Sequence, residues 1–77
     1  MKVMVKVYDT IKYDPNSKKV SEKEFDIISF KVRMLRDEDV IAMGIGEVDP
    51  CGEYLFLTLT GGGIAIFNNN LCDMFKV

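Results

Sequence analysis

The chain has 77 residues and a net charge of −2, and 48% of its residues are hydrophobic. This length allows one domain, residues 1–77, and so large an apolar share excludes a disordered tail. The net charge is weak, and the sequence has no clustered basic stripe of the kind that binds duplex nucleic acid. The absence of histidine removes the commonest general base and transition-metal ligand.

The first half of the chain opens with an alternating stretch. Residues 2–13 alternate between an apolar and a polar face, which predicts a half-buried strand. Asp9 falls in the apolar register, which predicts a bulge or bend there. Residues 14–17, Asp-Pro-Asn-Ser, predict a turn because proline presets φ and the Asp and Asn side chains bond the local backbone. Residues 18–24 then form either a return strand or a solvated loop.

Residues 21–35 fit two different elements. Ser21 and Glu24 have the spacing of a helix capping box, and apolar residues follow near helical spacing. From Ile28 to Met34, however, apolar residues alternate strictly with Ser, Lys and Arg, and a helix here would leave no single apolar stripe. We therefore predict a strand over residues 26–35 with a bulge near Ile27 and Ile28. The alternative is an α+β fold in which residues 21–35 are helical.

A charged connection and a second apolar stretch come next. Residues 36–39, Arg-Asp-Glu-Asp, predict a solvated loop, since a hard-metal site needs more oxygen ligands at regular spacings. Residues 40–48 are apolar on both faces up to Glu47, which predicts a strand. Their two glycines do not continue into a dinucleotide-binding fingerprint. Residues 49–52, Asp-Pro-Cys-Gly, predict a second proline turn.

The most strand-like stretch, residues 53–67, is interrupted by three glycines. The leucines at 55, 57 and 59 share one predicted face, which we assign to the core. The opposite face and the glycines form the candidate binding surface, which consists of Tyr54, Phe56, Thr58, Thr60, Gly61, Gly62 and Gly63. We expect the glycines to form a hairpin turn with positive φ. The alternative is a loop whose backbone amides hold an anion.

The last residues leave one question open. Asn68, Asn69 and Asn70 predict a turn or a helix cap, and residues 70–77 fit a short helix and a final strand equally well. Cys51 and Cys72 are the only cysteines. Because the N-terminus lacks the apolar core of a signal peptide, we expect free thiols in a cytoplasmic protein. No apolar run approaches the ~20 residues of a membrane span.

Together these elements predict a mainly β domain. We expect a small antiparallel meander of five or six strands, forming either a partly closed barrel or a sheet completed by dimerisation. A lone sheet with two apolar faces must curl, receive a helix or pack against another copy, because it is not stable in water by itself.

The expected function is binding rather than catalysis. Residues 1–24 carry six lysines and four acids, whereas residues 41–77 carry four acids and one lysine, which allows head-to-tail contact between copies. We predict a small intracellular binding protein that acts through protein contact and forms a homodimer or a higher homo-oligomer. Its size fits the inhibitors and regulators of larger proteins that phages and mobile elements encode.

Two other classes of binding stay open. One is a binder of a small anionic ligand such as a nucleotide, held at Gly61–Gly63. The other is a small β-barrel that binds nucleic acid through Tyr8, Tyr13 and the lysines of the first strand. We expect no catalytic residue, no metal ligand and no cofactor.

Overall fold

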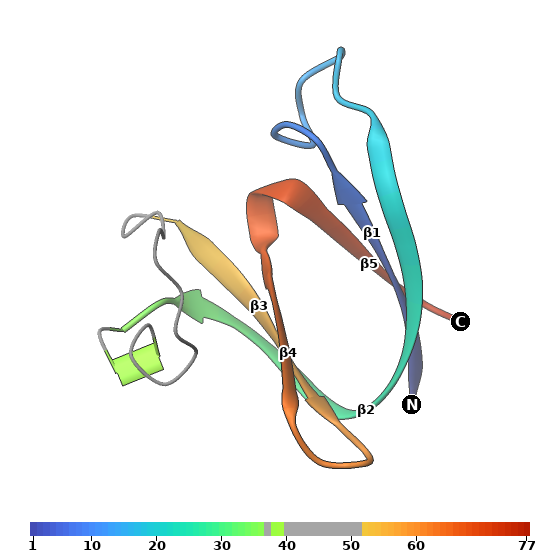
Figure 1. Cartoon of the computed structure of the whole chain (residues 1–77), viewed down its shortest axis with the longest axis vertical. Coiled ribbons are helices and arrows are strands. Elements are labelled where there is room, and N and C mark those ends of the chain that lie inside the picture. Colours follow the sequence, from blue (N-terminus) through green and yellow to red (C-terminus); the bar gives the residue numbers. More distant parts are fainter. Residues whose placement is uncertain (37, 40–51) are drawn as a thin grey trace.

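The computed structural model describes residues 1–36, 38–39 and 52–77. In chain order the described elements are five strands and one short 3-10 helix: β1 (Lys2–Tyr8), β2 (Lys19–Met34), β3 (Glu53–Leu59), β4 (Ile64–Asn68), η1 (Asn69–Leu71) and β5 (Cys72–Lys76). The prediction of a mainly β domain is confirmed (Figure 1). No helix in this described part of the chain is long and apolar enough to cross a membrane.

The strands form one antiparallel sheet in the order β4-β3-β2-β1-β5. The first four strands follow one another as the predicted meander. β5 then returns to the opposite side and pairs with β1, so the two ends of the described chain lie next to each other in the sheet (Figure 1). The sheet bends strongly but is not closed into a barrel.

β2 is long enough to serve two parts of the sheet. Its first half pairs with β1 from Lys19 to Asp26, and its second half pairs with β3 from Ile27 to Met34. The register shifts between Ile27 and Ser29, so a β-bulge lies where the two halves meet. A bulge bends a strand and increases its twist, and β2 curves visibly between its two partners (Figure 1).

The predicted strand and bulge in this region are therefore confirmed, and residues 18–24 supply the return strand. The alternative in which residues 21–35 are helical is wrong. The physical reason is the period-two alternation, which lets the strand place Phe25 and Ile27 against the core. A helix would have spread the same apolar residues around its circumference.

The first strand is shorter than predicted. β1 ends at Tyr8, after a register shift between Val7 and Tyr8, so its predicted continuation to residue 13 is wrong. The chain bends at Asp9, where the position of this residue in the apolar register predicted a bulge or bend. Its carboxylate accepts a hydrogen bond from the Lys18 amide at 2.8 Å, and its own amide donates to the Lys18 carbonyl at 3.0 Å.

The core lies between the two parts of the bent sheet. Its fully buried members come from four strands, and they are Val3, Val5, Ile27, Leu55, Leu57 and Cys72. The leucine face of β3 is thus core, as predicted. Phe25 and Phe67 close one side of this cluster with their rings edge to face at 5.7 Å, an arrangement that aromatic pairs favour.

The glycine turn forms the predicted hairpin between β3 and β4. Gly62 and Gly63 have φ of 91° and 90°, a region in which only glycine is unstrained. Further on, the Asn68 side chain caps η1 by accepting a hydrogen bond from the Asn70 amide at 2.9 Å. The chain then continues as β5, which decides the open question in favour of a final strand. The predictions for residues 40–48, for Cys51 and for most of the turn at 49–52 lie outside the described residues.

Candidate functional site

The seven residues of the predicted binding surface do not form one open face. Tyr54 and Phe56 are buried and Thr58 is half-buried, whereas Thr60 and the three glycines are exposed at the hairpin. The guanidinium carbon of Arg33 lies 4.0 Å from the centroid of the Phe56 ring, so Arg33 covers one face of this ring. Another molecule would therefore reach the hairpin end of this surface rather than its aromatic centre.

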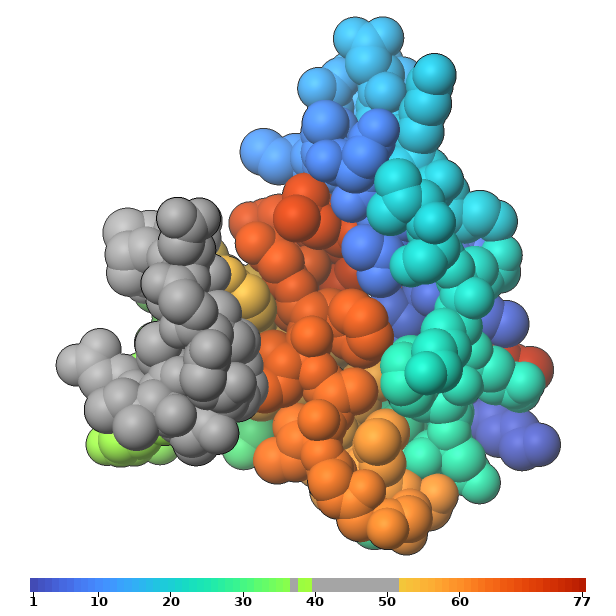
Figure 2. Space-filling view, viewed as in Figure 1, coloured from blue at the N-terminus to red at the C-terminus, as the bar shows by residue number. Residues whose placement is uncertain are grey.

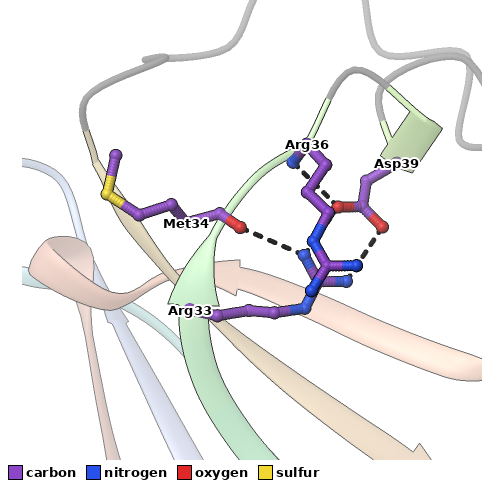
Figure 3. A network of polar contacts seen from close by, with 4 residues as sticks. All are labelled: Arg33, Met34, Arg36 and Asp39. Atoms are coloured by element: carbon purple, nitrogen blue, oxygen red, sulfur yellow. Dashed lines mark hydrogen bonds and ion pairs between the residues drawn. The ribbon is translucent and has the colours of Figure 1, made fainter.

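The Arg33 guanidinium, which lies over the Phe56 ring, is held in place by polar contacts. Figure 3 shows this network, which joins Arg33 to Met34 and Asp39. Its two terminal nitrogens donate to the two carboxylate oxygens of Asp39 at 2.7 and 2.9 Å, and one of them also donates to the Met34 carbonyl at 3.0 Å. The Arg36 amide donates to Asp39 at 2.9 Å. The hydrogen bonds of such a bidentate ion pair are shorter and stronger than those between neutral groups. The network ties the segment after β2 back onto the sheet.

This geometry gives Asp39 a structural role. The hydrogen bonds from Arg33, followed by the one from the Arg36 amide, hold the pKa of the Asp39 carboxyl well below its usual range. The carboxylate is therefore occupied and not available as a metal ligand. Among residues 1–36, 38–39 and 52–77, no group of three or more cysteine, aspartate or glutamate side chains is placed to hold a metal ion.

We predict that Asp39→Asn removes part of the acid sensitivity of the fold. A carboxyl whose native pKa is depressed stabilises the protein above its unfolded pKa of about 4, and this contribution is lost as the pH falls through the native value. Wild-type stability should therefore fall more steeply below about pH 4 than that of Asp39→Asn. Urea unfolding followed at several pH values measures the difference. Glu38→Gln, at the exposed neighbouring position, is the control and should keep the wild-type slope.

A second polar cluster joins the segment after β1 to β5. The Lys12 ammonium lies 3.2 Å from a carboxylate oxygen of Asp73 and donates to the Cys72 carbonyl at 3.0 Å. The Tyr8 hydroxyl donates to the other Asp73 oxygen at 3.0 Å, and this hydrogen bond is the main reason that the pKa of Tyr8 is raised. Two groups that a nucleic-acid surface would use are therefore bound to an aspartate of the same chain.

The surface that sequence reasoning missed is an apolar row on the second half of β2, formed by Ile28, Phe30, Val32 and Met34. These four side chains are between 44% and 66% exposed. Phe30 and Val32 stand opposite Leu57 and Leu55 in the register, so they lie on the core face of the sheet.

The row is exposed because β2 continues beyond the point where its pairing with β1 ends. β1 pairs with β2 only as far as Asp26, and Met1 closes that ladder by exchanging hydrogen bonds with Ile27 at 2.8 and 3.1 Å. Beyond that point, β3 is the only described strand that pairs with β2. The strict alternation of residues 28–34 was visible in the sequence, but the shorter reach of β1 was not.

The thiol and the two carboxylates described above are either buried or paired within the chain. Burial raises the pKa of the Cys72 thiol, so it stays protonated near neutral pH, where a nucleophile would need the thiolate. Asp39 and Asp73 are both engaged by cations of the same chain. Comparison of this chain with models of known protein families, with curated proteins and with solved structures finds no match.

Proposed function

We propose that this chain is a small, non-catalytic binding protein that acts through protein–protein contact and associates with a second copy of itself through the apolar row of β2. The observation that carries the proposal is the row itself. Single exposed apolar residues are ordinary on protein surfaces, but contiguous ones mark contact sites. Here four occupy one half of a single strand.

The distribution of charge supports a second copy as the partner. Lys31 and Arg33 stand opposite Phe56 and Tyr54 in the register, so they lie on the other face of the sheet from the row. Two rows packed across a two-fold axis would therefore bury apolar groups against one another and keep these cations outside. A two-fold contact uses the same surface of both copies, which a self-complementary apolar row satisfies.

The small size of the domain is a physical reason for association with a second copy. A domain of this length buries only roughly 60% of the surface that its unfolded chain exposes, and its stability is correspondingly small. Packing Phe30, Val32 and Met34 against a copy would extend the core that already includes Leu55 and Leu57 on the same face. The apolar area removed from water would stabilise both copies.

We predict that Phe30→Glu converts the dimer to a monomer. The substitution places a charge in the apolar contact, and a symmetric dimer carries it twice, so the dissociation constant should rise by about 100-fold or more. Sedimentation velocity at micromolar concentrations measures the change, with circular dichroism to show that the variant is folded. Val20→Glu is the matched control, because Val20 is an exposed apolar residue in the first half of the same strand.

Two results would contradict the proposal. The first is a wild-type protein that is monomeric throughout the micromolar range. The second is a Val20→Glu variant that dissociates as readily as Phe30→Glu, since the effect would then come from added charge and not from the row.

The anionic-ligand alternative gains no support from the described residues. The Gly62 amide donates to the Leu59 carbonyl at 3.1 Å, so the hairpin already uses it. The turn then leads into β4, whereas phosphate-holding loops gain much of their affinity from a following helix. We therefore propose no ligand for Gly61–Gly63.

A further inference from the structure

The second half of β2 presents a backbone edge as well as an apolar row. β1 accompanies β2 only as far as Asp26, and β3 is the only described strand that pairs with the residues beyond (Figure 1). In Figure 2 the blue atoms of β1 lie against the cyan first half of β2, which is the half that β1 covers. The edge of residues 28–34 that faces away from β3 therefore has no partner among the described strands.

The hydrogen bonds of β3 show which way its backbone groups point. The Leu59 amide donates to the Gly63 carbonyl across the hairpin, whereas the Thr60 amide donates to the Asp26 carbonyl of β2, both at 3.1 Å. Backbone groups of successive strand residues point to opposite sides. The even-numbered residues of β3 therefore turn their amides and carbonyls toward β2, and the odd-numbered ones turn theirs toward β4.

The same alternation fixes the groups along β2. Ser29 and Lys31 lie opposite even-numbered residues of β3, so their amides and carbonyls face β3. Phe30, Val32 and Met34 lie between and beyond them, so their amides and carbonyls face the other edge. The three residues of the row thus offer backbone donors and acceptors at regular spacing, and an edge of this kind is a template for another strand.

We infer that the second copy pairs with this edge, so that β2 of each copy adds an antiparallel strand to the sheet of the other. The inference rests on the proposed dimer and specifies how its two β2 strands meet. A two-fold axis perpendicular to the sheet uses the same edge of both copies and keeps both apolar rows on one face. Strand addition of this type supplies main-chain hydrogen bonds in addition to apolar contact.

Charge and space restrict the register of this pairing. Edge-facing residues must meet edge-facing residues, so the axis passes through a residue and not between two. An axis at Lys31 or Arg33 would place identical cations directly opposite each other, which destabilises a sheet. An axis at Phe30 would bring the end of the second strand onto Ile27, where Met1 already forms hydrogen bonds at 2.8 and 3.1 Å.

An axis at Val32 avoids both conflicts. Val32 then lies opposite its own copy, and Phe30 lies opposite the partner's Met34, a pairing that brings a thioether next to an aromatic ring. Lys31 lies opposite the partner's Arg33, whose charge is already paired with a carboxylate of its own chain. The Met34 carbonyl also accepts a hydrogen bond from Arg33, and a carbonyl oxygen has a second lone pair for the ladder.

Amide hydrogen exchange tests the edge. In the dimer, the amides of Phe30, Val32 and Met34 should exchange at least about 10-fold more slowly than after dilution to the monomer. Ser29 and Lys31 are internal controls in the same strand, because their amides face β3 in both states. Mass spectrometry with fragmentation to single residues measures both sets.

The outcomes separate this inference from the dimer proposal. A dimer in which the three edge-facing amides exchange as fast as in the monomer would overturn the edge pairing and leave the dimer intact, since the rows would then pack face to face. Protection that appears in β4 instead would overturn it in the same way. A wild-type protein that is monomeric throughout the micromolar range would overturn both proposals.

Disulfide cross-linking tests the register. Val32→Cys should form a linked dimer by itself, because opposite residues of paired strands lie within disulfide range. Phe30→Cys should not link to itself, since its copy is displaced by four residues, or ~13 Å. A mixture of Phe30→Cys and Met34→Cys should instead give a linked heterodimer. Val20→Cys and the wild type, with its native cysteines, set the background, and a Val32→Cys variant that links no better than these would overturn the pairing at Val32.

Discussion

Leu57→Ala should lower the free energy of unfolding by about 2–5 kcal/mol. Leu57 is 0% exposed and lies in the middle of β3, opposite Phe30 on one neighbouring strand and Ala65 on the other. Removing its isobutyl group leaves a cavity in the core. The sheet cannot move in to fill this cavity, because β3 is paired with a strand on each side. At roughly 0.05–0.15 kcal/mol per residue, the loss is a large part of the stability expected for a chain of this length. Urea unfolding followed by circular dichroism measures it.

The control for this substitution is Ile64→Ala. Ile64 is also a large aliphatic residue of the same sheet, but it is exposed on β4, so its truncation should change stability by no more than about 0.5 kcal/mol. Both variants must be compared at one protein concentration, because association makes apparent stability depend on concentration. Equal losses for the two variants would mean that Leu57 is not the centre of the core.

The double variant Gly62→Ala with Gly63→Ala should lose roughly 2–4 kcal/mol, about 1–2 kcal/mol for each site. Both glycines have positive φ near 90°, which an L-residue adopts only with strain. A Cβ added at either position would meet nothing within 4 Å, so the loss comes from the backbone conformation and not from a clash. Thermal unfolding at a fixed protein concentration measures this loss.

Gly61→Ala is the matched control for the hairpin. A Cβ added at Gly61 would also lie in open space, but the φ of this residue is not positive, so alanine there should be neutral or stabilising by up to about 1 kcal/mol. If all three glycines tolerate alanine equally, the turn does not have the backbone conformation described above.

Local pattern was enough to predict most of the strands. The alternation of residues 28–34 and its slip at Ile27 and Ile28 predicted the second half of β2 and its bulge, because strand side chains repeat every two residues whatever the strand's partner. The hairpin at Gly61–Gly63 was predictable for a similar reason, since positive φ is a property of the residue itself.

Properties that depend on distant partners were not predictable. Tyr54 and Phe56 have the pattern of a second face, but Arg33 lies over the Phe56 ring and is fixed there by Asp39. The exposure of Phe30 depends on where β1 stops pairing. The residues next to Tyr54 in the sequence do not indicate that Arg33 covers the neighbouring Phe56 ring. The residues next to Phe30 do not indicate where β1 stops pairing.

The pairing of β1 with β5 has a consequence for how the protein folds. Val3 pairs with Lys76, and the Val77 amide donates to the Lys2 carbonyl at 3.1 Å. The first strand therefore gains its second neighbour only after β5 has been synthesised. Contacts between residues so far apart in sequence slow folding, because the intervening chain must be closed into a loop before they form. On the ribosome, β1 should remain incompletely packed until β5, which supplies Cys72 to the core, has emerged.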